Sequence, residues 1–162
     1  MNLLKKSLIL LVLAVSSFSA NSQQPKNVYS TDNINTKTNH PVAWQTYLEN
    51  ELVKIEYKFA DCDPSKGLDN ESVILRITNL SQSKVEITWL HELSYDGECK
   101  TCDYEEEYSY NFVLGPGESL EGECEYTTDK RLRIFSKFID AAYTKGQRLS
   151  SFRLGDLTIT VY

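Results

Sequence analysis

The stretch from Ser72 to Tyr95 decides the fold, and it reads SVILRITNLSQSKVEITWLHELSY. Apolar residues occupy every second position in its first half and again in its second half: Val73, Leu75, Ile77, Val85, Ile87, Trp89 and Leu93. Such period-two alternation, rich in β-branched residues, predicts half-buried strands. The polar segment Asn79–Lys84 between the two runs has the Asn and Ser side chains that favour turns. We therefore expect a β-hairpin whose apolar face packs against a second sheet.

Five further segments show strand patterns, and runs of turn-forming residues separate them. They cover residues 53–59, 108–114, 120–126, 132–139 and 151–162. Gly155 interrupts the last segment, as a β-bulge would. Residues 41–52 carry apolar side chains at mixed spacing, which fits either a short N-terminal helix or a bent first strand. About seven short strands without a helical repeat predict an all-β fold, an antiparallel β-sandwich.

Two motifs carry a resemblance to a known kind of domain. The run Val73–Ser81 ends an apolar strand in Asn79, and the turn Leu114–Ser119 reads LGPGES. Both resemble motifs of secreted bacterial β-sandwich modules of the immunoglobulin-like or fibronectin-III-like kind. The resemblance covers Leu52–Tyr162 and implies an immunoglobulin-like sandwich, a fold that does not by itself imply a function. The chain departs from antibody domains, because Trp89 has no Cys on either side at their spacing.

The first 22 residues have the pattern of a secretory signal peptide. Lys5 and Lys6 precede an unbroken apolar run, Leu8–Val15, and small residues follow up to Ser22. The alternative, an uncleaved membrane anchor, needs roughly 20 apolar residues, which is longer than this run. Residues 23–40 are polar, so we expect a disordered lead-in there. One β-sandwich domain is expected over residues 41–162, a length that suits a single domain.

The charge of the chain narrows the classes of partner. The formal net charge is −6, and it becomes −8 once Lys5 and Lys6 leave with the signal peptide. An acidic domain repels nucleic acid and anionic lipid, so we expect neither nucleic-acid binding nor membrane insertion after cleavage. The expected location is secreted or periplasmic.

The chain has four cysteines: Cys62, Cys99, Cys102 and Cys124. An even number of cysteines behind a signal peptide predicts disulfides, because exported proteins meet an oxidising environment. Three pairings are open, and we expect Cys99–Cys102 with Cys62–Cys124. A zinc site with four thiolates is the alternative, since two of the cysteines have ligand spacing. A reactive redox pair is disfavoured, because every cysteine has an acidic neighbour that raises the pKa of its thiol.

Acidic residues cluster around the turn after the strand at 53–59: Asp61, Asp63, Asp69 and Glu71. Calcium binds several oxygen ligands from one loop, so these residues are candidates for a calcium site. The loop is not an EF-hand, because counting from Asp61 places Gly67 at position 7 and Ser72 at position 12. A solvated acidic loop without a metal is the simpler interpretation.

Tyr104, Tyr108 and Tyr110 are the candidate binding surface, because alternation places them on one face of a strand. Tyrosine combines an apolar ring with a polar tip, which suits contacts with a protein or a glycan. The same face carries Phe112 and Leu114, so burial of these rings in the core is the alternative.

No catalytic motif is present in the sequence. His40 falls in the polar lead-in, and His91 alternates in phase with the apolar residues of its strand, which predicts a half-buried structural residue. We therefore expect a disulfide-stabilised, non-enzymatic binding or structural module. Two alternatives stay open: a metal-handling protein, and a small carbohydrate-active enzyme with two carboxylates in a cleft.

Overall fold

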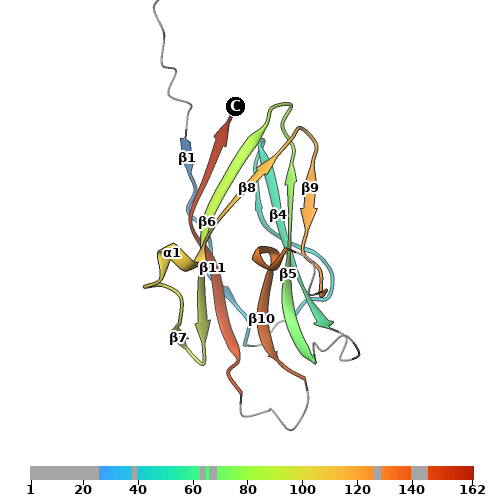
Figure 1. The fold of residues 1–162 in the computed structure, drawn as a ribbon, viewed down its shortest axis with the longest axis vertical. Coiled ribbons are helices and arrows are strands. Elements are labelled where there is room, and N and C mark those ends of the chain that lie inside the picture. Colours follow the sequence, from blue (N-terminus) through green and yellow to red (C-terminus); the bar gives the residue numbers. More distant parts are fainter. Residues whose placement is uncertain (1–25, 38–39, 63–64, 66–68, 126–128, 140–145) are drawn as a thin grey trace, which may run out of the picture.

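The computed structural model describes residues 26–37, 40–62, 65, 69–125, 129–139 and 146–162. The expected signal peptide lies outside these residues, as does Asp63 of the expected calcium loop. The chain folds as an all-β sandwich in which two antiparallel sheets pack face to face (Figure 1). The eleven strands described exceed the seven expected by four, at Lys26–Val28, Ile34–Asn35, Gln45–Glu49 and Glu98–Cys99, and three of these have only two or three residues.

The first sheet has β11 and β6 at its centre. The order is β1-β11-β6-β7, with β2 also paired to β11 and β8 also paired to β6. Its strands are β1 (Lys26–Val28), β2 (Ile34–Asn35), β6 (Val85–Tyr95), β7 (Glu98–Cys99), β8 (Ser109–Leu114) and β11 (Leu149–Val161).

The second sheet has β5 and β4 at its centre, in the order β10-β5-β4-β3, and β9 also pairs with β5. Its strands are β3 (Gln45–Glu49), β4 (Val53–Cys62), β5 (Asn70–Asn79), β9 (Ser119–Glu121) and β10 (Arg133–Phe138). A one-turn helix, α1 (Glu105–Tyr108), and a 3-10 turn at Lys130–Leu132 complete the described elements. No helix in the described ranges is long and apolar enough to cross a membrane.

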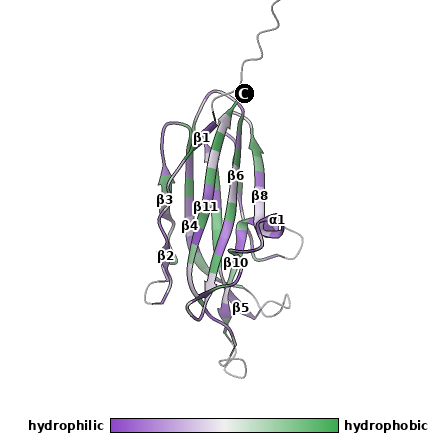
Figure 2. Ribbon diagram, turned by 90° about the vertical axis from the view of Figure 1, so that its left-hand side faces the viewer, coloured by the Kyte–Doolittle hydropathy of each residue, from purple (hydrophilic) through white to green (hydrophobic). Residues whose placement is uncertain are grey.

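The core lies between the sheets and is built from the alternating residues of the long strands (Figure 2). Val73, Leu75 and Ile77 of β5 are fully buried, and so are Val85 and Ile87 of β6. Each such side chain contributes about 1.5–3 kcal/mol by leaving water. The apolar pattern that defined the strands in the sequence is therefore also the pattern that joins the two sheets.

The expected hairpin between β5 and β6 is wrong. β5 pairs with β4 and β10 in one sheet, whereas β6 pairs with β11 and β8 in the other. The segment between them crosses from sheet to sheet as an arch, at the upper end of Figure 1. Alternation of apolar residues specifies which face of a strand is buried. The same alternating pattern occurs whether a hairpin or an arch joins the two strands, so the pattern does not distinguish them.

Asn79 holds this arch together. Its side chain is 1 % exposed, and its Nδ2 donates to the backbone carbonyls of Ser83 (2.8 Å), Gly115 (2.8 Å) and Leu114 (3.2 Å). Its Oδ1 accepts from the backbone N–H of Ser81 (2.9 Å) and from the hydroxyl of Ser81 (2.8 Å). One buried amide thus ties the arch to the Gly-Pro-Gly turn after β8, and joins the two motifs that carry the family resemblance.

The N-terminal region also differs from expectation. β3 is a strand, so the short helix considered for residues 41–52 is not formed. Residues 26–37 were expected to be disordered, yet β1 and β2 pair with β11. Strands this short show no period-two pattern, and their pairing depends on backbone hydrogen bonds that sequence alternation does not report.

The bulge expected at Gly155 is present. The register between β11 and β6 shifts between Gly155 and Thr158, and Asp156 has a φ of 49°. A Cβ atom at Gly155 would lie 2.1 Å from Oε1 of Glu92 on the neighbouring strand. Glycine is needed there because the Glu92 carboxylate, which is paired with Arg153, fills the space.

Candidate functional site

The first disulfide joins Cys62, at the end of β4, to Cys124, 62 residues later, with a Cα–Cα distance of 5.3 Å. Cys62 is buried, and Arg133 Nη1 donates to the backbone carbonyl of Cys124 (3.1 Å). The disulfide ties the chain beyond β9 to the end of the second sheet that is opposite the Asn79 arch.

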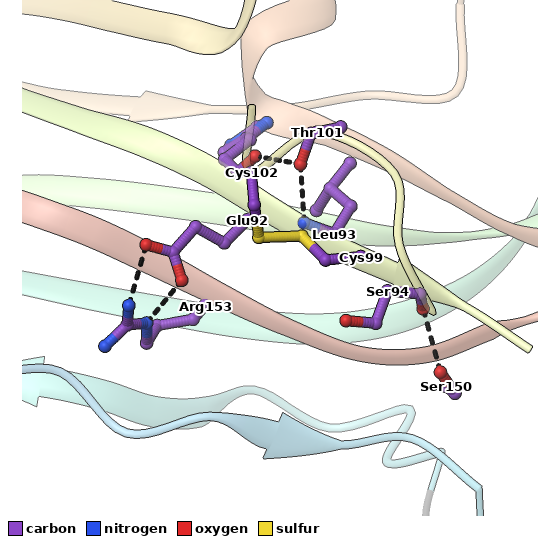
Figure 3. The surroundings of a disulfide bond; sticks show 9 residues. Glu92, Leu93, Ser94, Cys99, Thr101, Cys102, Ser150 and Arg153 are labelled. Atoms are coloured by element: carbon purple, nitrogen blue, oxygen red, sulfur yellow. Dashed lines mark hydrogen bonds and ion pairs between the residues drawn. A yellow bond between two sulfur atoms is a disulfide. The ribbon is translucent and has the colours of Figure 1, made fainter. Parts of the chain in front are cut away.

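The second disulfide, Cys99–Cys102, spans three residues and lies beside β6 (Figure 3). Thr101 anchors its loop, since the Thr101 hydroxyl donates to the backbone carbonyl of His91 and accepts from the Leu93 N–H (2.8 Å). Thr101 is buried whereas Cys102 is exposed. This disulfide therefore staples a surface loop and does not join distant parts of the chain.

Both disulfides follow the expected pairing, and they overturn the zinc hypothesis. All four cysteines lie in the described part of the chain, and none of them is free. Zinc requires thiolates, which disulfide sulfur atoms do not supply.

The described residues of the acidic loop do not gather as a calcium site would. Glu71 is buried, its Oε1 contacts His40 Nδ1 (2.7 Å) and accepts from the Ser136 hydroxyl (2.8 Å), and its Oε2 lies 3.4 Å from Lys137 Nζ. Both oxygens therefore face protein donors. Within the described ranges, no group of three or more His, Cys, Asp or Glu side chains gathers as metal ligands would, and Asp61 and Asp69 join no such group.

The three tyrosines do not share a strand face. Tyr104 caps the start of α1 and is 60 % exposed, Tyr108 ends α1, and Tyr110 lies on β8. The Tyr110 ring packs edge-on against His91, with ring centroids 4.7 Å apart, and burial raises the pKa of its phenol. The strand face on which the binding surface was expected is therefore absent for these residues, and Tyr110 is partly core.

His91 is more buried than expected. It is 3 % exposed, and burial lowers the pKa of its imidazole to about 3. In the described part of the chain, its Nε2 and the Nε1 of Trp89 have no hydrogen-bond partner. His91 is thus a neutral residue of the core, away from any acid–base partner.

His40 is fixed in place, although it was assigned to the polar lead-in. Its ring stacks on Phe59 with a centroid distance of 4.5 Å. Its Nδ1 contacts the Glu71 carboxylate and its Nε2 contacts the backbone carbonyl of Thr36 (2.5 Å). Both of these partner atoms are hydrogen-bond acceptors. His40 thereby attaches the segment between β2 and β3 to the inner face of β5.

A pocket opens beside this cluster, at the lower end of the sandwich in Figure 1, where β11 begins and β10 ends. We call it the end pocket, and its volume is about 430 Å³. Its lining comes from four separate parts of the chain: Thr36, Lys37, His40, Asp96, Ser136, Lys137, Arg148, Leu149 and Ser150.

A second hollow of about 310 Å³, the side pocket, shares Lys137 and Arg148 with the end pocket. Asp61 and Glu71 also line it, and these two residues lie directly opposite each other in the β4–β5 register. Together the two hollows are lined by six charged side chains: Lys37, Asp61, Glu71, Asp96, Lys137 and Arg148.

The lining of the end pocket includes three hydroxyl groups and three cationic side chains. Its hydroxyl hydrogens are committed to the protein: Thr36 Oγ1 donates to the carbonyl of Leu149, Ser136 Oγ to Glu71, and Ser150 Oγ to the carbonyl of Ser94 (3.0 Å). The cationic side chains of Lys37, Lys137 and Arg148 also line the end pocket.

Sequence analysis did not find this site. Its residues come from segments more than a hundred positions apart, and they meet only because β2, β10 and β11 end at the same edge of the sandwich. Asp61 and Glu71, which the sequence indicated as candidate calcium ligands, line the neighbouring side pocket and not the end pocket. No protein-family model matches the chain, and no curated protein matches it.

Proposed function

We propose that this protein is an exported, non-enzymatic binding module: a disulfide-stabilised β-sandwich that holds a small ligand in its end pocket. The observation that carries the proposal is the end pocket itself. It is concave, lies at a loop-bearing end of a rigid scaffold, and combines a few charged groups with hydroxyls, as ligand sites do.

Export is supported by two independent features. The first 22 residues have the charge and apolar pattern of a signal peptide, and both cysteine pairs form disulfides, which persist in oxidising compartments. Intact-mass analysis of protein recovered from outside the cytoplasm tests this part. We expect a chain that lacks residues 1–22 and takes up no alkylating reagent without reduction. A full-length mass with alkylated thiols would contradict export.

The binding function can be tested by amide NMR spectra of the chain against a panel of neutral sugars, acidic sugars, amino acids and short peptides. We expect at least one class to shift the resonances of Lys37, Lys137 and Ser150, and every ligand to be recovered unchanged. Shifts confined to other surfaces, or no shifts with any class, would refute the end pocket as the binding site.

A second candidate function is glycoside hydrolysis, which one observation favours. Asp61 and Glu71 face the same hollow from opposite positions of a strand pair, and two carboxylates flanking a sugar are the usual hydrolytic arrangement. Against it, three protein donors already occupy the Glu71 carboxylate. The same NMR panel separates the two functions, because a hydrolase would release reducing ends from oligosaccharides, and Asp61→Asn would abolish that release.

A further inference from the structure

The end pocket is the middle one of three adjoining hollows. It shares Lys137 and Arg148 with the side pocket, and it shares Lys37 and Ser150 with a third hollow of about 390 Å³. The side pocket and the third hollow have no lining residue in common, so they lie on different sides of the end pocket. We call the three together the track, and a ligand that fills the track is elongated.

The third hollow lies on the outer face of the first sheet and is lined mainly by uncharged polar side chains. Asn35 of β2 and Ser94 of β6 both lie opposite Ser151 of β11 in the strand register. Asn33 and Asn35 are exposed, and the two serines are half-buried. Amide and hydroxyl groups both donate and accept hydrogen bonds, so this part of the track suits a ligand with the same double capacity.

The charges along the track balance one another. The lining of the end pocket and the side pocket has three cations and three carboxylates, and such a lining gives no net attraction to either an anion or a cation. Glu71 and Arg148 already have partners within the protein. Lys37, Asp61 and Asp96 are exposed, so the track presents a charged donor and charged acceptors to a ligand.

An aromatic ring lies at the side-pocket end of the track. Phe138, the last residue of β10, lines the side pocket and is 45 % exposed. Its ring packs edge-on against Phe135, with ring centroids 4.9 Å apart, and this contact fixes its position. The flat apolar face of such a ring can cover the C–H groups on one face of a sugar ring.

An extended peptide is the other elongated ligand that both donates and accepts. Peptides of this kind bind mainly through main-chain hydrogen bonds to an open strand edge. Along the track, the backbone N–H groups of Thr36, Asp96 and Gly97 already donate to acceptors within the protein, at 2.9–3.0 Å. The track therefore offers side chains to a ligand, and these favour a sugar chain over a peptide.

We infer that the track binds a neutral oligosaccharide, whose hydroxyls bond Asn33 and Asp61 and whose ring at the side pocket packs on Phe138. Each sugar hydroxyl both donates and accepts, which matches the mixed lining, and a ligand without charge matches a lining without net charge. This inference rests on the proposed function, to which it adds the chemical class of the ligand.

The test is an NMR titration of the protein with tetrasaccharides of glucose, xylose and N-acetylglucosamine, and with each monosaccharide. We expect at least one tetrasaccharide to bind about tenfold more tightly than its monosaccharide, because only the longer ligand spans adjoining hollows. Added salt should change this affinity less than about twofold, since the ligand has no charge. Tetragalacturonate and tetraalanine, an acidic sugar chain and a peptide, should bind about tenfold more weakly than that tetrasaccharide.

Two variants test the two sides of the track. Asn33→Ala in the third hollow and Phe138→Ala in the side pocket should each weaken the tetrasaccharide about fivefold, because each removes contacts with one end of the ligand. Asn27→Ala, an exposed Asn on β1, and Tyr162→Ala, a ring that is 49 % exposed, are the matched controls and should change nothing. Unfolding curves check that all four variants are folded.

Three outcomes would overturn the inference: tetrasaccharides that bind no more tightly than monosaccharides, Asn33→Ala and Phe138→Ala variants that retain full affinity, or controls that lose as much affinity as these variants. If tetraalanine or tetragalacturonate shifts the end-pocket resonances while no neutral tetrasaccharide does, the inference fails and the binding function stands. If no ligand of this set or of the panel above reaches the end pocket, both fail.

Discussion

The two ends of the sandwich are closed in different ways. At the arch end, Asn79 satisfies its amide entirely with backbone groups and a neighbouring hydroxyl of the protein. At the opposite end, Lys37, Lys137 and Arg148 border a hollow. At the arch end the buried amide of Asn79 bonds the protein itself, whereas at the pocket end the charged side chains of Lys37 and Lys137 line a hollow, which is why we place the binding site there.

The pocket end is stabilised by a covalent crosslink. It contains Cys62, whose disulfide to Cys124 closes a loop of 62 residues, whereas neither disulfide lies at the arch end. The comparison teaches that the end of the sandwich that opens into a hollow is also the end that has the long covalent crosslink. Four predictions test or sharpen it, in order of decreasing effect.

Removal of the long disulfide should have the largest effect. Replacing Cys62 and Cys124 by Ala should lower the free energy of unfolding by about 4 kcal/mol, because the crosslink restricts a 62-residue loop of the unfolded chain. The same change at Cys99 and Cys102, which close three residues, should cost less than about 2 kcal/mol. Urea unfolding measures both, and equal losses would show that loop closure does not explain the rigidity of the pocket end.

Asn79→Ala should come next, with a loss of about 3 kcal/mol, because it leaves several buried carbonyls without a donor. Ser83→Ala is the control, since Asn79 bonds only the backbone of Ser83. A loss below about 1 kcal/mol for Asn79→Ala would mean that water replaces the amide and that the arch end is not self-contained.

Acid should weaken the core between the two ends. His91 takes up a proton near pH 6.5 in the unfolded chain but only near pH 3 in the folded one, because burial disfavours its charge. The unfolded state therefore binds more protons in this window, and stability falls as the pH drops. By pH 5 the loss should be about 2 kcal/mol. His91→Leu should remove this dependence in thermal unfolding between pH 7 and pH 5, and an unchanged slope would exclude His91 as its source.

Glu71→Gln should have the smallest effect, about 1 kcal/mol, because Gln can still accept from the Ser136 hydroxyl while Lys137 remains solvated at the pocket rim. Chemical denaturation of Glu71→Gln and of Asn79→Ala measures the two losses of unfolding free energy for comparison. A larger loss for Glu71→Gln than for Asn79→Ala would reverse the assignment of the two ends.

The sequence was sufficient for features that depend on local pattern. Alternation located the long strands, Gly155 marked the bulge, and the even count of cysteines led to the disulfides. The sequence was insufficient for features that depend on which strand a segment pairs with. The arch at Asn79–Lys84 has the composition of a hairpin turn, and only the pairing of β5 with β4 and of β6 with β11 reveals that it crosses between sheets.

The candidate site could not be predicted from sequence patterns for a related reason. Lys37 and Lys137 are ordinary surface residues in the sequence, and their meeting depends on β2 and β10 ending at one edge of the sandwich. Glu71 was noticed for its acidic neighbours, but strand pairing turned it towards His40 and Ser136. The site is formed by the pairing of strands that are distant in the chain, and a single sequence does not report this pairing.

The arch also has a consequence for how the chain folds. Because β5 and β6 lie in different sheets, β6 must find its partner β11 across a long stretch of chain, as the pairing of Leu93 with Phe152 illustrates. β11 is the last strand described and the centre of its sheet, since β1, β2 and β6 all pair with it. High contact order of this kind slows folding. During synthesis, β6 can pair with β7 and β8 as they follow it, but the first sheet stays incomplete until β11 has emerged.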